Sequence, residues 1–328
     1  MSANKWAEFP LKANRFLERV FPLLITLGVV LGVTLPWVFS GLRPFVPLFF
    51  GTVTLVGALK LRVRELGRAV SSPIPIIFFF LTARIVLPLA VFLLSSFVFR
   101  NEPDIVSGYV LLYAMPAAVT SFIWVTIFKG DPALALTLIV LDTMLAPIVV
   151  PGTVLLFLGT AITLNITGMA VSLILMVVIP TVAGVILNES SQGKIPALIT
   201  PYLAPFSKLL MLLVMAANAS AVAHLVRFDN PLLWIIMAAC IGFIVLIFIC
   251  TRLATLAGKF NREKQISLLF TSSLRNTAAA MTLAIRYFPE AAALPAVLGI
   301  MFQHNTAAIM GRIFFGKNGS GENPPGKP

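Results

Sequence analysis

Two apolar stretches of the chain carry polar side chains that could bind a charged solute inside a membrane. Residues 270–285 contain Arg275 and Asn276 among serines and threonines, and residues 115–128 contain Ser121 in an otherwise apolar run. An arginine at the middle of a bilayer costs roughly 2.5–3.5 kcal/mol on the mildest scale, so it normally faces a polar cavity or a partner. Two interrupted segments in corresponding halves of a chain are typical of a transporter's binding site.

Further polar side chains within the apolar segments extend this candidate site. The substrate-binding residues that we predict are Ser121, Arg275, Asn276, Gln303 and Asn218, and the candidates for coupling to an ion include Asp142, Thr143 and Thr120. Asn218 lies among alanines and a serine, a setting that also suits close helix packing with an interhelical hydrogen bond. We expect these side chains to line a cavity in which Arg275 recognises a carboxylate through its fork geometry.

Asp142 is the only acidic residue deep in an apolar segment. An isolated carboxylate there would be protonated rather than charged, so its natural partner is a cation. Arg275 is the first candidate for that partner, and Arg84, in an earlier segment, is the second. Two roles stay open for Asp142: an ion pair that only fixes helix packing, or a place in the transport path that includes carrying a proton.

The sequence holds no signature of an enzyme or of a resident metal. Paired carboxylates, a Ser-His-Asp order and a Gly-rich phosphate loop are all missing, so we predict no catalytic residues. Cys240 and Cys250 lie ten residues apart in one apolar segment, and we interpret them as packing or lipid-facing residues. We interpret His304 as a packing residue rather than a proton carrier. We therefore expect no metal site and no cofactor, with sodium or a proton as the possible coupling ion.

The composition is that of a polytopic membrane protein. Hydrophobic residues make up 59% of the 328-residue chain and charged residues 11%, whereas about a quarter of the residues in a soluble domain are charged. A helix needs about 20 mostly apolar residues to cross a bilayer, and only helices or closed barrels do so. We predict ten transmembrane helices, at residues 20–40, 43–60, 74–99, 105–128, 132–159, 166–187, 205–226, 231–258, 265–287 and 290–315.

Lysine and arginine are distributed unequally between the two sets of loops that these helices define. The set on the side of the termini holds 16 of them, and the other set holds 4, among them Arg100 and Arg286. The net charge of +12 therefore reflects topology beside anionic lipid rather than nucleic-acid binding. We predict a multi-pass protein of the inner (plasma) membrane with two cytoplasmic ends, an N-terminal segment at residues 1–19 and a disordered tail at residues 316–328.

Weak internal similarity divides the chain into halves. Matching positions recur at offsets of 158 to 161 residues, as between Pro22 and Pro180. We predict two five-helix repeats, at residues 20–159 and 166–315. An odd number of helices in each repeat inverts the second copy in the membrane.

A resemblance to a known family rests on the same segments. Residues 129–147, KGDPALALTLIVLDTMLAP, preceded by Ser121, resemble the fourth and fifth helices of the bile acid:sodium symporter family. The ninth predicted helix, with the Arg275-Asn276 pair, and the tenth, with His304 and Asn305, resemble the second crossing helix and the last helix of that family. The resemblance covers nearly the whole chain after residue 20.

The resemblance implies a fold and a function. It implies ten helices in two inverted repeats, with a panel domain of the first, second, sixth and seventh helices and a core domain of the others. The fourth and ninth helices would be broken where they cross, near residues 120–122 and 273–276. Members of the family move organic anions, usually together with sodium.

The chain departs from the family at the positions that bind sodium. Thr271 replaces a glutamate that precedes the ninth-helix asparagine by five residues, and Arg275 replaces the glutamine just before it. Phe122 and Ala83 replace an asparagine and a glutamine in the fourth and third helices. Thr271 remains an ion-coupling candidate because it occupies the position of the family's glutamate. The loss of these oxygen ligands nevertheless argues against sodium binding.

We therefore predict a secondary transporter that carries a small organic anion, bile-acid-like or a carboxylate, by alternating access and without sodium. The alternatives are a sodium-coupled organic anion symporter and a membrane sensor or scaffold that kept the fold and lost transport. Arsenite transport is disfavoured because the fourth segment contains no cysteine. The oligomeric state does not follow from the sequence, and the expected partners are the anion and the lipid bilayer, with no nucleic acid.

Overall fold

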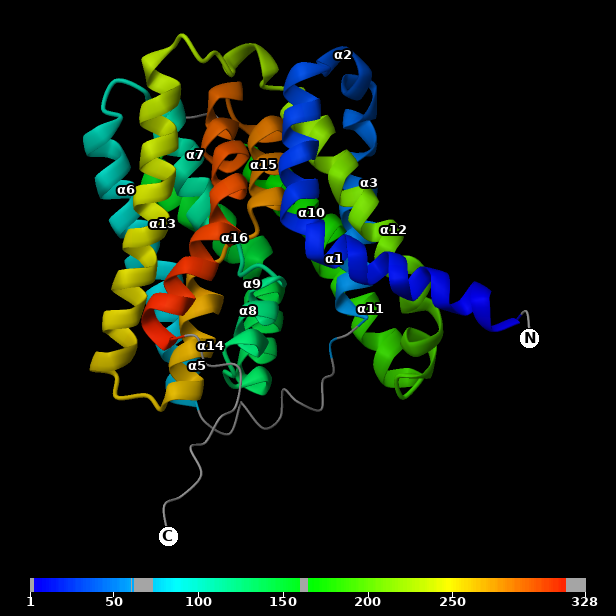
Figure 1. Ribbon diagram of the computed structural model, residues 1–328. Coiled ribbons are helices and arrows are strands. Elements are labelled where there is room, and N and C mark those ends of the chain that lie inside the picture. Colours follow the sequence, from blue (N-terminus) through cyan, green and yellow to red (C-terminus); the bar gives the residue numbers. More distant parts are fainter. Residues whose placement is uncertain (1–2, 60, 62–72, 160–164, 317–328) are drawn as a thin grey trace.

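The computed structural model describes residues 3–59, 61, 73–159 and 165–316, and it is built from helices (Figure 1). Within these residues β pairing is limited to one isolated bridge. The tail predicted at residues 316–328 lies outside the described residues except for Gly316, as does most of the basic loop near residue 65.

The helices of the first half of the chain are α1 (Ala3–Thr34), α2 (Pro36–Phe39), the 3-10 helix η1 (Ser40–Phe45), α3 (Val46–Ala58), α5 (Pro73–Leu81), the π-helix η2 (Thr82–Val86), α6 (Leu87–Val98), α7 (Pro103–Ala114), α8 (Ser121–Ile127) and α9 (Pro132–Leu158). Those of the second half are α10 (Ile166–Leu173), the π-helix η3 (Ile174–Val178), α11 (Ile179–Ser190), α12 (Lys194–Ala219), η4 (Ala223–Leu225), α13 (Pro231–Ala257), α14 (Arg262–Ser273), α15 (Thr277–Tyr287), η5 (Glu290–Ala293) and α16 (Leu294–Phe315).

The helices confirm an all-α polytopic membrane protein. Among the described residues, seven helical runs are long and apolar enough to cross a membrane: Pro36–Ala58, Pro73–Val98, Pro132–Leu158, Ile166–Ser190, Lys194–Ala219, Pro231–Ala257 and Glu290–Phe315. The other three predicted helices correspond to α1, whose apolar part is shorter, and to the broken pairs α7–α8 and α14–α15. The inverted relation of the two halves stays a prediction.

The predicted limits of the seventh helix, residues 205–226, are wrong at both ends. In the structure α12 runs from Lys194 to Ala219 and continues through Pro201 and Pro205. The prediction counted only a run of about 20 mostly apolar residues, whereas proline, which removes a backbone donor, does not end this helix. Helices that pack on neighbours in a membrane tolerate such prolines.

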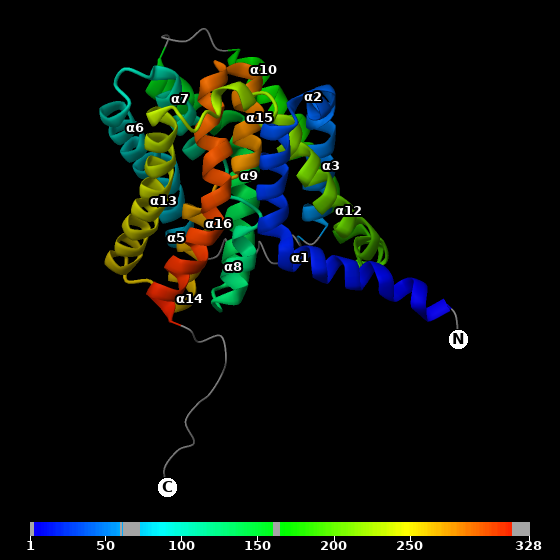
Figure 2. The same cartoon turned by 45° about the horizontal axis from the view of Figure 1, so that its top comes forward.

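The helices form two groups that lie side by side (Figures 1 and 2). In one group, which we call the panel helices, α1 packs on α12, and α3 packs on α11 and α12. The panel also includes α10 and η3, which run into α11 without a break. In the other, which we call the core helices, α13 packs on α14 and α16, and α7 packs on α6, α9 and η5. The first part of α1 projects away from the bundle in both views. The two broken helix pairs belong to the core helices.

Glycines let α1 lie directly against α12 within the panel. A Cβ atom at Gly32 would stand 2.2 Å from the carbonyl oxygen of Ala216, and one at Gly28 would stand 2.8 Å from that of Leu212. Both obstacles are backbone atoms, which cannot move aside as a flexible side chain can. The close approach of these two helices therefore requires the absence of a side chain at Gly32.

We expect Gly32→Ala to lower the thermal midpoint of the detergent-solubilised protein, because overpacking a close contact typically costs about 1–3 kcal/mol. Gly57→Ala is the matched control, since nothing lies within 4 Å of a Cβ atom at that position of α3. Alanine is the better helix former by up to about 1 kcal/mol, so the control should melt no lower than the parent. The midpoints can be read by size-exclusion chromatography after heating, and equal midpoints for both variants would contradict the contact.

Candidate functional site

The first break, between α7 and α8, follows from a proline. Met115, which ends α7, has an extended backbone with ψ of 153°, and Pro116 follows it. Proline offers no N–H for a helical hydrogen bond and disfavours the helical conformation of the residue before it. The unwound segment is thus residues 115–120. It includes Thr120 of the predicted residues 120–122 but begins five residues earlier, because the proline acts earlier in the chain.

The second break, between α14 and α15, lies inside the predicted range of residues 273–276 and has no proline. Leu274 has a ψ of 116°, and α15 starts at Thr277. The Oδ1 atom of Asn276 accepts a hydrogen bond from the N–H of Ala279 at 3.2 Å, which caps the new helix. The cap explains where α15 begins, whereas the extended backbone of Leu274 and Arg275 depends on contacts from elsewhere in the fold.

Those contacts come from the first break, because the two unwound segments pair with each other. Ala117 and Arg275 form an antiparallel bridge. The N–H of Ala118 donates to the carbonyl of Leu274 at 3.0 Å, and the N–H of Asn276 donates to the carbonyl of Pro116 at 2.9 Å. Backbone groups buried in a membrane protein need such partners. We call residues 115–120 and 274–276 together the crossing.

A side chain from α16 completes the pairing of the second segment. The carboxamide of Gln303 accepts from the N–H of Arg275 and donates to its carbonyl oxygen, both at 3.0 Å. Gln303 therefore contacts the crossing, and both atoms of its amide are bonded to backbone; its predicted role in substrate binding stays a prediction.

Asp142 pairs with Arg84, so the first choice of Arg275 as its partner is wrong. Nε of Arg84 donates to Oδ1 of Asp142 at 2.6 Å, and the other carboxylate oxygen accepts from the N–H of Ala117 at 2.7 Å. All of Asp142 and nearly all of Arg84 are buried. The carboxylate thus accepts a hydrogen bond from a backbone N–H, that of Ala117, which has no helical partner because the helix is broken there.

The Arg84 guanidinium also binds carbonyl groups of the same break. Its Nη1 atom donates to the carbonyls of Ala114 and Met115, the second at 3.2 Å. Arg84 itself lies in the π-helix η2, on the segment that leads from α5 to α6. The ion pair therefore joins α9 and η2 to the last turn of α7.

Arg275 is the second guanidinium at the crossing, and it too reaches carbonyl oxygens. Its Nη1 atom donates to the carbonyl of Met115 at 3.3 Å and its Nη2 atom to that of Ala83 at 2.8 Å. The residue is 1% exposed, and its Nε atom has no hydrogen-bond partner among the described residues. Within the described part of the chain no carboxylate lies at ion-pair distance from Arg275.

Hydroxyl groups without partners surround the two breaks. The Oγ atoms of Ser121, Ser272 and Ser273 are buried and make no hydrogen bond within the described residues. Ser121 is the first residue of α8, and Ser273 is the last of α14. A buried polar group that has no partner in the protein is normally hydrogen-bonded to a ligand or to water. Ser121 was predicted for this site; Ser273 was not, although its position before the break could have indicated it.

The threonines predicted for ion coupling lie in three different settings. Thr271 is buried and donates to the carbonyl of Ser267 at 2.6 Å, one turn earlier in α14. Thr143 is buried next to Asp142 in α9, and Thr120 is partly exposed just before α8. The Thr271 hydroxyl is thus used within its own helix.

The Asn218 side chain is bonded to α15. Its Nδ2 atom donates to the hydroxyl of Thr282 at 2.8 Å, which joins α12 of the panel to α15 of the core. The sequence allowed two roles for Asn218, substrate binding or an interhelical hydrogen bond. The structure contains such a hydrogen bond. His304, interpreted as a packing residue, accepts a hydrogen bond from the indole of Trp124 at 3.5 Å.

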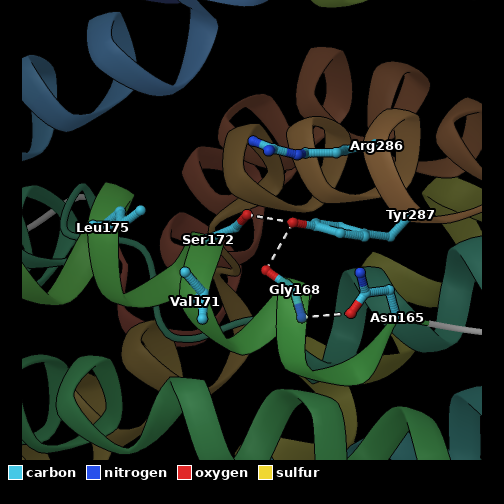
Figure 3. Close-up of a pocket in the computed structure, with 7 residues that line it drawn as sticks. All are labelled: Asn165, Gly168, Val171, Ser172, Leu175, Arg286 and Tyr287. Atoms are coloured by element: carbon cyan, nitrogen blue, oxygen red, sulfur yellow. Dashed lines mark hydrogen bonds between the residues drawn. The ribbon is translucent and has the colours of Figure 1, made fainter.

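A cavity of about 490 Å³ lies elsewhere, between α10 of the panel and the end of α15 in the core (Figure 3). Its lining is formed by Asn165, Gly168, Val171, Ser172, Leu175, Arg286 and Tyr287. Sequence reasoning missed this group, because its members are far apart in the chain and ordinary in type. The sequence analysis had noted only Arg286, as one of the 4 lysine and arginine residues in the loops on the side opposite the termini.

Comparisons with known proteins identify the family. Residues 46–227 match the Sodium Bile acid symporter family. Over 298 residues the chain is 35% identical to the uncharacterized protein YbaS of Bacillus subtilis, covering 88% of this chain and 95% of the relative. It is 22% identical to the uncharacterized sodium-dependent transporter YocS of the same organism, over 93% of this chain and 94% of the relative. It is also 27% identical to the probable sodium/metabolite cotransporter BASS1, chloroplastic, of Arabidopsis thaliana, over 63% of this chain and 50% of the relative.

Proposed function

Because this chain belongs to the sodium bile acid symporter family and is a secondary transporter, not an enzyme, we propose that it carries a small organic anion and does so without sodium. The observation that carries this proposal is the charge of the crossing. Two buried guanidinium groups, those of Arg84 and Arg275, stand there with one carboxylate, that of Asp142. Their formal charges leave one positive charge without a partner.

An uncompensated charge buried in a membrane protein is costly, and such groups commonly mark the path of a substrate. Arg84 is already neutralised by Asp142 at 2.6 Å, so the free charge is that of Arg275. Within the described residues the Nε donor of this guanidinium is unused, and the hydroxyls of Ser121, at the start of α8, and of Ser272 and Ser273, at the end of α14, have no partners. A carboxylate would supply both the missing charge and the missing acceptors.

The same groups disfavour a sodium ion. A hard cation is bound by oxygen ligands, but the carbonyl oxygens of Met115 and Ala83 already accept hydrogen bonds from Arg275. A cation nearby would also be repelled by the unpaired guanidinium. We propose that Arg275 fixes the crossing permanently, as a bound ion would do.

Asp142 serves in this proposal as a structural anchor rather than as a proton carrier. Its two oxygens are taken by Arg84 and by the Ala117 N–H. The fold itself thus supplies a partner for each carboxylate oxygen. Transport would then be facilitated diffusion of the anion, driven by its own gradient and by the membrane potential.

We propose further that the protein resides in the inner (plasma) membrane with both ends of the chain cytoplasmic. The excess of lysine and arginine on that side, 16 against 4, supports this orientation. The ends of the helices that carry Arg100 and Arg286 would then face the outside of the cell.

Proteoliposomes test the sodium prediction directly. Counterflow of labelled organic anions, including the carboxylates cholate and benzoate, first identifies an anion that the protein carries. Its uptake should then be equal in sodium and choline buffers at a fixed membrane potential, and an imposed pH gradient should not alter it. A steep, saturable dependence on sodium would overturn the proposal and favour a sodium-coupled symporter, the alternative that the names of two relatives support. Absence of counterflow for every anion would favour the sensor or scaffold.

A further inference from the structure

The cavity between α10 and α15 has a framework of hydrogen bonds that join the panel to the core (Figure 3). The hydroxyl of Tyr287 donates to the carbonyl of Gly168 at 2.7 Å and lies 2.6 Å from the hydroxyl of Ser172. Oδ1 of Asn165 accepts from the N–H of Gly168 at 2.7 Å and so caps α10. These bonds hold the lining residues in place without a ligand.

The framework also decides which groups are free to bind. Since the single Tyr287 proton goes to the Gly168 carbonyl, the Ser172 hydroxyl must donate its own proton to the Tyr287 oxygen. Neither hydroxyl then has a proton left for a ligand. The donors that remain are the guanidinium of Arg286, which is exposed, and the Nδ2 atom of Asn165, whose other amide atom makes the cap.

The free donors make the cavity a place for an acceptor with a negative charge. The Arg286 guanidinium lies 5.6 Å from the centre of the Tyr287 ring, a cation–π contact that orients it while its N–H groups stay available. Among the seven lining residues none is acidic, so Arg286 has no counterion there. Val171, Leu175 and the Tyr287 ring add an apolar wall.

The cavity is separate from the crossing. Arg286 follows Arg275 by 11 residues, and most of that interval is α15. At a rise of 1.5 Å per residue, the two arginines are about 16 Å apart along the helix. The volume of about 490 Å³ falls in the range of small-molecule sites, roughly 300–1,000 Å³.

We infer that this cavity is a second binding site, which takes a small organic carboxylate at the end of the molecule predicted to face outside. Arg286 and the Asn165 amide bind the carboxylate, and Val171, Leu175 and the Tyr287 ring contact its apolar part. The inference rests on the proposed function only for the class of the ligand. It requires neither transport nor sodium independence.

Chemical protection of Arg286 tests the site without any transport measurement. The full-length protein, in nanodiscs of zwitterionic lipid, is treated with the arginine reagent phenylglyoxal, and modification of each arginine is followed by mass spectrometry of peptides. Benzoate at ten times its dissociation constant should slow the modification of Arg286 about tenfold, as site occupancy requires. Modification of Arg100, exposed in the α6–α7 loop, should not change, and benzamide, which has no charge, should protect neither.

A conservative variant shows whether benzoate sits in the cavity itself. Asn165→Asp keeps the helix cap but removes the Nδ2 donor and adds a negative charge, so the benzoate concentration that protects Arg286 should rise at least about tenfold. Asn230→Asp is the matched control, because Asn230 caps α13 through its Oδ1 atom at 3.0 Å and lies outside the cavity. Its protection curve should equal that of the parent.

Three results would overturn the inference. Arg286 could react at the same rate with and without benzoate, or Asn165→Asp could leave the protection curve unchanged. In a parallel arm the nanodiscs contain phosphatidylglycerol, and protection by that lipid without protection by benzoate would assign the cavity to a lipid headgroup instead.

Discussion

An Arg84→Gln variant will lose thermal stability sharply, and adding Asp142→Asn will restore part of the loss. Arg84 and Asp142 are both buried, and Nε of the arginine lies 2.6 Å from the carboxylate. Removing one partner of a buried ion pair leaves the other charge uncompensated, which typically costs about 3–5 kcal/mol. Removing both partners leaves no such charge, so the double variant should be the more stable of the two.

The measurement is the thermal midpoint of the parent, the two single variants and the double variant in one detergent. A second Arg–Asp pair supplies the control, because Arg227 and Asp229 lie 2.8 Å apart with side chains 68% and 67% exposed. An exposed pair contributes about 0–1 kcal/mol, so Arg227→Gln should hardly change the midpoint. If the losses from Arg84→Gln and Asp142→Asn simply add, the two residues are not coupled and the assigned pair is wrong.

The second large effect concerns the anion itself: Arg275→Gln should weaken its binding while the protein stays folded. A hydrogen bond to a charged group contributes about 1.5–3 kcal/mol, which corresponds to roughly a ten- to hundredfold loss of affinity. Arg275→Lys should lie between the parent and Arg275→Gln, because lysine keeps the charge but lacks the planar fork. Arg275→Gln gives up hydrogen bonds to the carbonyls of Met115 and Ala83 but leaves no carboxylate unpaired among the described residues, so the variant should fold with a lower thermal midpoint than the parent.

Affinity can be measured as the KM of uptake in proteoliposomes for the anion that the parent carries, at several salt concentrations. The control is Arg252→Gln, another arginine within a helix, which packs on the Phe315 ring at 4.8 Å and binds Gln265. Its KM should match that of the parent. An unchanged KM and an unchanged salt dependence in Arg275→Gln would show that Arg275 is not the anion site.

Some of the candidate site could be predicted because its causes are local. Pro116 cannot continue a helix, so a break in that segment follows from a single residue. Asn276 is a residue type that starts helices, and it does cap α15. An arginine within an apolar stretch must find polar partners, and Arg275 does lie at the crossing.

The exact breaking point and the helix limits were harder to predict. The break after α7 begins before the predicted residues because Pro116 affects Met115, its predecessor. In α12 the opposite occurs, since Pro201 and Pro205 stay inside a continuous helix. The same residue type ends one helix and not the other, because neighbouring helices determine whether the freed backbone groups find partners.

By itself the sequence determined that the chain is a polytopic helical membrane protein with polar residues in two broken segments, because composition, apolar length and proline act through local physics. Only the tertiary structure decided which charges meet. Asp142 pairs with Arg84, 58 residues away, rather than with Arg275. It also decided that Leu274 is extended against Ala118, and that Asn165 and Arg286 line one cavity. These contacts join residues far apart in the chain, and which of them form depends on which helices pack side by side.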